Sequence, residues 1–147
     1  MNTLPPEIAA LLTGRPGQLE WEPVFPLVTV DEDGFPRACM LSTSELRWGG
    51  CDLRAVLRGR RARRDLRRHG QALLIVVGEC HVHSLRLMVA ADRESDQGAD
   101  VVRFRVTAVT SDGVGVPLTA TKFLRTAALD AREQVDVNAV LLHGDDV

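Results

Sequence analysis

Apolar and polar residues alternate over several stretches of the chain, and this period of two is typical of half-buried β-strands. The alternation is longest in two stretches, residues 81–92 and 100–110. Shorter runs rich in β-branched and other apolar residues predict further strands at 24–30, 35–43, 46–48, 52–57 and 71–78. Six or seven strands are therefore expected.

Turn-forming residues separate these runs. The segment Asp31-Glu32-Asp33-Gly34 predicts a hairpin between the first two strands, because Asp-Gly supplies the positive φ angles that a tight reversal needs. A second turn is predicted at 111–113, directly after the strand at 100–110. Strands joined mainly by tight turns form an antiparallel sheet. The chain is thus expected to be mainly β, a six- to seven-stranded antiparallel barrel or sandwich with few helices.

Three segments have helical patterns. A short N-terminal arm at about 4–14 has prolines in its first turn and a glycine as its stop. A second helix is predicted at 59–69, ending at Gly70. A third is predicted from Thr119 or Thr121 to Ala131, and the tail at 135–142 is either a last strand or an arm toward a partner. No interdomain linker is evident, so residues 1–147 are expected to form one domain, with a C-terminal helix and tail at about 119–147.

Composition indicates the cellular compartment. The three cysteines, Cys39, Cys51 and Cys80, show no paired spacing and are interpreted as reduced thiols. The first residues lack the basic and apolar regions of a signal peptide. The longest apolar run, 72–77, is too short to span a bilayer. A cytoplasmic protein with no membrane segment is expected.

Charge is concentrated in one segment. Residues 54–68 contain eight arginines and a single acid, Asp65, although the whole chain carries a net charge of −2. The first turn of the predicted helix offers backbone N–H groups and the positive end of the helix dipole. Arg60, Arg61 and Arg64 add guanidinium donors that suit a phosphomonoester. The alternative is a solvated helix face with no ligand. Nucleic acid is an unlikely partner, because the net charge is negative and no aromatic residues are interleaved to stack on bases.

The order of these features resembles a known family. The hairpin turn 33–37 has a Gly-x-Pro pattern, and a strand, the arginine stretch 60–66 and the apolar strand 71–78 follow it. Over residues 24–110 this order resembles the FMN-binding split-barrel proteins related to pyridoxamine 5′-phosphate oxidase. Arg60 stands where the family commonly has a small hydroxyl residue. Asp65 stands in place of an asparagine and is expected to pair with a nearby arginine.

The resemblance implies a split barrel that binds FMN, with Arg61 on the flavin phosphate. It implies that the strand segments 40–42 and 55–57 line the isoalloxazine ring, often through backbone groups. The candidate ring contacts are Met40, Leu41, Ser42, Ala55 and Val56. It also implies a homodimer in which two chains share each flavin site.

The favoured function is an FMN-dependent oxidoreductase acting on a small molecule, in which the cofactor carries the chemistry. No catalytic residue is identifiable from the sequence. Two alternatives stay open. The first is a non-catalytic carrier or sensor of flavin, deazaflavin or haem. The second is a split barrel without cofactor that serves as an interaction domain.

Two further groups of residues are candidates for chemistry. Cys80-His81-Val82-His83 places two histidines on one face of a strand, but zinc sites need three or four converging ligands, so no metal site is predicted. Cys39 lies on the strand that would face the flavin. A thiolate activated by the arginines is one interpretation, and a small buried apolar residue is the favoured one.

Overall fold

The computed structural model describes residues 4–12, 21–78, 80–94, 98–118, 122–124, 127–128 and 131. Seven strands form one continuous sheet in the order β2-β1-β5-β6-β7-β4-β3, and a short eighth strand also pairs with β1. Every pairing is antiparallel. The strands are β1 (Trp21–Val30), β2 (Pro36–Ser42), β3 (Leu46–Trp48), β4 (Asp52–Leu57), β5 (Gln71–Gly78), β6 (His81–Glu94), β7 (Asp100–Gly113) and β8 (Lys122–Leu124). The predicted mainly β, antiparallel architecture is confirmed.

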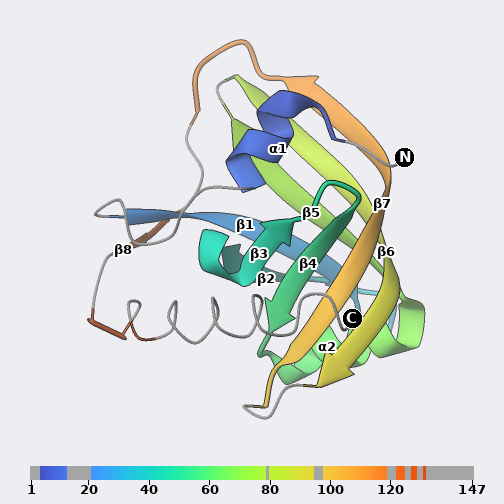
Figure 1. Cartoon of the computed structure of the whole chain (residues 1–147). Helices are drawn as coiled ribbons and strands as arrows, with labels where there is room; N and C mark the ends of the chain where they lie inside the picture. Colours follow the sequence, from blue (N-terminus) through green and yellow to red (C-terminus); the bar gives the residue numbers. More distant parts are fainter. Residues whose placement is uncertain are drawn as a thin grey trace.

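The sheet curls into a half-barrel (Figure 1). Its two longest strands, β6 and β7, pair with register shifts between Arg86 and Leu87 and between Val89 and Ala91. Such irregularities bend a strand and increase its twist. The two outer strands of the path, β2 and β3, are consecutive in the chain and are joined only by the 3-10 turn η1 (Thr43–Glu45). Curling therefore lets a three-residue turn join the two ends of the sheet.

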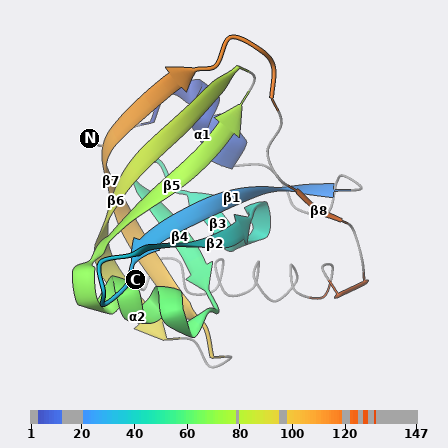
Figure 2. The same ribbon diagram turned by 180° about the vertical axis from the view of Figure 1, so that it is seen from behind.

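Two helices lie at opposite ends of the half-barrel (Figures 1 and 2). Helix α1 (Pro6–Leu12) adds Ile8 and Leu12 to the core, and helix α2 (Arg60–His69) adds Leu66. Most of the rest of this core comes from inward-facing strand residues such as Phe25 and Phe104. Among the helices that the structure describes, none is both long and apolar enough to cross a membrane.

Most predicted elements are present. The hairpin at Asp31–Gly34 forms as expected, with Gly34 at φ 82° and Val30 opposite Pro36. Gly70 ends α2 with φ 69°, a left-handed conformation that glycine adopts without steric cost.

Three boundaries differ from the prediction. β1 begins at Trp21, in a segment expected to be a loop, because residues 21–23 pair with β8. The turn expected at 111–113 belongs instead to β7, which pairs with the start of β6 as far as Gly113. The helix predicted at 119–131 is wrong over Lys122–Leu124, which form β8. Most of the remainder of that segment, and the tail at 135–142, lie outside the described residues.

Candidate functional site

The arginine segment forms α2 with an N-terminus that no side chain caps. Gly59 precedes the helix in an extended conformation, and its carbonyl accepts the first helical hydrogen bond from the N–H of Arg63 at 3.2 Å. The N–H groups before that position have no acceptor within a helix. A Cβ added at Gly59 would meet no atom within 4 Å, so the approach to this N-terminus is open. An anion can therefore reach the positive end of the helix dipole.

The arginines of α2 occupy two sides of the helix, because residues three and four apart share a side. Four of them, at i, i+3, i+4 and i+7, line an open pocket of about 310 Å³: Arg60, Arg63, Arg64 and Arg67. Arg61 and Arg68 lie on the other side, and Arg68 forms an ion pair with Glu32 of the β1–β2 turn at 3.2 Å. The predicted phosphate ligands are thus divided, with Arg60 and Arg64 in the pocket and Arg61 on the other side of the helix.

Acidic residues hold the C-terminal arginines of the helix. Asp100, at the start of β7, is only 1% exposed and pairs with Arg67 at 2.8 Å and with Arg63 at 3.5 Å. Within the described residues, the three predicted phosphate ligands, Arg60, Arg61 and Arg64, form no ion pair. All three are exposed. The guanidinium groups nearest the helix N-terminus are therefore the ones left to bind an external anion.

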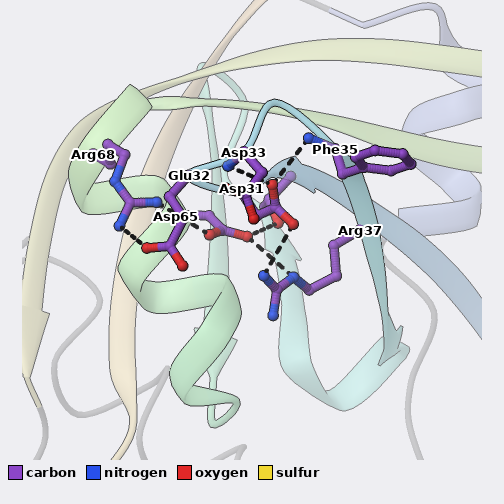
Figure 3. Close-up of polar contacts among 8 residues, drawn as sticks. Asp31, Glu32, Asp33, Phe35, Arg37, Asp65 and Arg68 are labelled. Atoms are coloured by element: carbon purple, nitrogen blue, oxygen red, sulfur yellow. Dashed lines mark hydrogen bonds and ion pairs between the residues drawn. The ribbon is translucent and has the colours of Figure 1, made fainter.

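Asp65 fastens α2 to the first hairpin (Figure 3). Its carboxylate is 2% exposed and accepts a hydrogen bond from the hydroxyl of Thr29 at 2.8 Å. It also forms ion pairs with Arg37 at 3.6 Å and with Arg68 at 3.9 Å. The expectation that Asp65 pairs with a nearby arginine is confirmed. Asp65 turns inward and is buried, whereas Arg61, one helical turn before it, and Arg64 are exposed.

The β1–β2 turn, which Arg68 contacts through Glu32, is itself ordered by Asp31. The Asp31 carboxylate accepts hydrogen bonds from the backbone N–H groups of Phe35 and Asp33, both at 2.9 Å (Figure 3). The bond from Phe35 is the main reason that the pKa of Asp31 lies below its ordinary value. Arg37 and Arg68 add to this lowering, and partial desolvation opposes it.

A buried carboxylate connects the end of β2 with the start of α2. Glu45, 1% exposed, accepts hydrogen bonds from the backbone N–H of Ser42 at 3.1 Å and from its hydroxyl at 3.3 Å. Its other oxygen accepts from Arg58 at 3.1 Å. Arg58 stands two residues before α2, so Glu45 brings the predicted ring-contact strand close to the predicted phosphate-binding helix.

The structure separates the five candidate ring contacts into exposed and buried residues. Met40 is 43% exposed on the outer face of β2, which is the edge of the sheet. The other four are at most 3% exposed: Leu41, Ser42, Ala55 and Val56. Leu41 and Ala55 belong to the main core. A planar ring at this edge would therefore contact Met40 and the backbone of β2 rather than these buried side chains.

Cys39 is half-buried on β2. Burial raises the pKa of its thiol, and the nearby charge of Glu45 raises it further. The thiol is thus neutral at physiological pH. This supports the interpretation of Cys39 as a small apolar residue and contradicts an activated thiolate.

Sequence reasoning missed Asp100 and Glu45, the two buried acids that organise the site. Asp100 opens a strand and Glu45 follows a polar triplet, and neither position carries a pattern that predicts burial. The one feature of the sequence that could have indicated buried acids is the excess of arginine. Partly desolvated guanidinium groups need acidic partners, so some acids elsewhere in the chain had to pack against them. Among the described side chains, no group of three or more His, Cys, Asp and Glu residues is placed to hold a metal ion.

Comparisons of sequence and structure give different answers. No protein-family model matches the sequence, and no curated protein shows significant similarity to it. Solved structures do match. An F420 reductase is 18% identical, with a TM-score of 0.58, over 73% of this chain and 98% of that chain. The styrene monooxygenase flavin reductase of Pseudomonas putida S12 is 10% identical, with a TM-score of 0.57, over 74% of this chain and 93% of that chain.

A third likeness is to the flavoredoxin of Desulfovibrio vulgaris (Miyazaki F), which is 11% identical, with a TM-score of 0.52, over 77% of this chain and 91% of that chain. Identities this low concern the fold and leave the function to the site itself. The chain has the split-barrel fold of these proteins, and the predicted resemblance is confirmed at that level.

Proposed function

We propose that this chain binds FMN and serves as a flavin-dependent oxidoreductase for a small molecule. The observation that carries the proposal is the set of three exposed arginines without ion pairs in the described chain, at the open N-terminus of α2. Phosphomonoesters carry close to two negative charges, and such a cluster of guanidinium and N–H donors suits them. The split-barrel fold, shared with solved flavin reductases, supports the same proposal.

The residues fit the two ends of the cofactor differently. Arg60, Arg61 and Arg64 would hold the phosphate. Met40 and the edge backbone of β2 would contact the ring, near the Ser42–Glu45–Arg58 connection. When bound, the flavin would supply hydride transfer to or from a small substrate or a nicotinamide. The chain itself would bind and orient, which is consistent with a sequence that lacks an evident acid–base pair.

A homodimer is part of the proposal, because the ring site on β2 is open on one side. Pro26 of β1 lies opposite Met40, and Val28 lies between Ala38 and Leu73 in the register. These residues alternate with the core-facing ones and form an apolar strip across β2, β1 and β5 on the outer face. A second copy on this strip would cover Met40 and close the ring site. Sedimentation equilibrium with wild type and Met40→Asp tests this: the variant is expected to shift toward monomer.

The first experiment compares FMN with riboflavin, which has the same ring and no phosphate. Fluorescence titration of the purified protein is expected to show tighter binding of FMN. The variant Arg61→Ala/Arg64→Ala should reduce FMN affinity to the level of riboflavin, with riboflavin affinity unchanged. Arg47→Gln, which removes an exposed charge from β3, is the matched control. Equal affinity of wild type for both ligands, or no binding of either, would refute the phosphate site.

A second experiment separates an enzyme from a carrier. The flavin-loaded protein is mixed anaerobically with NADH or NADPH, and the flavin absorbance is followed before and after acceptors are added. Reduction followed by reoxidation supports the oxidoreductase. A flavin that no nicotinamide reduces would favour the carrier.

A deazaflavin cofactor is the second candidate, and a specific observation favours it. The pocket of Arg60, Arg63, Arg64 and Arg67 extends over two turns of α2, farther than one phosphate requires. A longer anionic tail would use this length. Coenzyme F420 belongs in the same titration. If it binds more tightly than FMN, the deazaflavin becomes the favoured cofactor and FMN the second candidate.

A further inference from the structure

A second pocket lies at the opposite end of the half-barrel from α2. It has a volume of about 440 Å³, in the range of small-molecule sites. Its described lining residues come from α1 and from the adjoining ends of β5, β6 and β7: Glu7, Leu11, Gly78, His81, His83 and Ser111. The two pockets are thus held by different helices at the two ends of the fold (Figures 1 and 2).

The polar groups of this pocket are held in fixed positions. His83 is 6% exposed, and its Nδ1 shares a hydrogen bond of 2.7 Å with the hydroxyl of Ser111 on β7. The ring of His81 stacks on that of His83, with centroids 5.9 Å apart and planes 12° apart. This pair depends on the extension of β7 to Gly113, which places Ser111 opposite His83 in the register.

Helix α1 supplies the charge. Glu7 and Leu11 are one helical turn apart, so both face the same side. The approach of α1 to the sheet is close, because a Cβ at Gly78 would lie 2.7 Å from the Leu11 side chain. Glu7 is exposed and forms no ion pair within the described residues. No arginine or lysine is among the described lining residues.

The charge balance of the pocket favours a cation. The lining contains one carboxylate, two imidazoles and one hydroxyl. A carboxylate only accepts hydrogen bonds, and each neutral imidazole offers one acceptor nitrogen. The described lining therefore contains one acidic side chain, no arginine or lysine, and several hydrogen-bond acceptors. A single metal ion suits the site poorly, since nearly parallel stacked rings do not direct their nitrogens to one point.

We propose that this pocket binds a small organic cation, a primary amine. Its ammonium group would pair with Glu7 and donate to the Ser111 and imidazole acceptors. Its apolar part would lie against Leu11 and the imidazole faces. This site is independent of the flavin proposal, and the two sites would select opposite charges.

The test is an NMR titration of the whole chain with three probes of one shape: benzylamine, benzyl alcohol and benzoate. Benzylamine is expected to shift the imidazole resonances of His81 and His83 with a Kd near 1 mM, and benzyl alcohol and benzoate should bind at least tenfold more weakly. Glu7→Gln should weaken benzylamine about tenfold. Because Glu7 is exposed, this variant is expected to fold, which the spectrum itself verifies.

Asp112→Asn is the matched control. Asp112 is exposed, alternates with Ser111 and is absent from the lining, so its loss should leave the benzylamine Kd unchanged. Tighter binding of benzoate, equal effects of Glu7→Gln and Asp112→Asn, or no histidine shifts at about 20 mM benzylamine would each overturn the proposal.

Discussion

The hydroxyl of Thr29 on β1 donates a 2.8 Å hydrogen bond to the carboxylate of Asp65 on α2, and both side chains are 2% exposed. The two residues are 36 positions apart in the chain. This contact fixes the rotation of α2 about its axis, and with it the direction in which the unpaired arginines point.

Asp65→Ala is expected to lower the free energy of unfolding by about 2–3 kcal/mol, because it leaves a buried hydroxyl and a nearby guanidinium without their acceptor. Thr29→Val, which keeps the shape, should cost about 1 kcal/mol. Urea denaturation of both single variants and the double variant measures the coupling between them. Asp33→Asn, an exposed residue of the same turn, is the control and should change stability by no more than about 0.5 kcal/mol. Additive losses from the two single variants would contradict this role of the pair.

Asp100→Asn is expected to destabilise the fold more than Glu32→Gln. Asp100 is buried and pairs with Arg63 and Arg67, so its loss should cost about 1–3 kcal/mol, reduced where Arg67 meets solvent. Glu32 is 62% exposed in its pair with Arg68, and such pairs contribute at most about 1 kcal/mol. Thermal and urea unfolding of the two variants compares them directly. A larger loss from Glu32→Gln would contradict the assignment of Asp100 as the anchor.

The lowered pKa of Asp31 predicts a loss of stability in acid. Since its folded pKa lies below the unfolded value, its contribution is complete above the unfolded value and disappears as the pH falls through the folded value. Asp31→Asn should therefore be less stable than wild type at about pH 7, and the difference should shrink at about pH 2. Denaturant unfolding at both pH values measures this. A difference that stays constant with pH would show that the charge of Asp31 contributes nothing.

The raised pKa of Cys39 predicts slow alkylation. With iodoacetamide at about pH 8, the exposed Cys51 should react first and Cys39 much later, because the thiolate is the reactive form. Peptide mass spectrometry after timed quenching assigns each rate. Glu45→Gln should accelerate Cys39 only slightly, since burial is the larger cause of the raised pKa and the Glu45 charge the smaller one. If Cys39 reacts before Cys51, the interpretation of Cys39 as an activated thiolate is supported instead.

The parts of this protein that follow from local physics were predictable. Runs of apolar and β-branched residues predicted β4 and β5 with the bounds that the structure has, and the Asp-Gly segment predicted the first hairpin. Gly70 ends α2 as expected, since the left-handed conformation there favours glycine. These features depend on neighbours in the chain, and a single sequence contains that information.

The prediction of a turn at Ser111-Asp112-Gly113 was wrong because these residues pair with a neighbouring strand. Those residues have turn propensity, but pairing with the start of β6 extends β7 through them. The strand Lys122–Leu124 likewise exists through its pairing with β1, against a helical pattern. Tertiary contacts outweighed local preference in both places.

The sequence by itself determined that an arginine-rich helix follows a strand, that the chain is mainly β, and which arginines stand in the first turns of the helix. Only the tertiary structure decided which arginines remain for a ligand. Asp100 and Glu45 are distant from α2 in sequence, and the curled sheet brings them to the arginines of α2 and to Arg58 just before it. It likewise brings Thr29 of β1 to Asp65 within α2. Charge is a property of composition, whereas the pairing and burial of a charge depend on the whole fold.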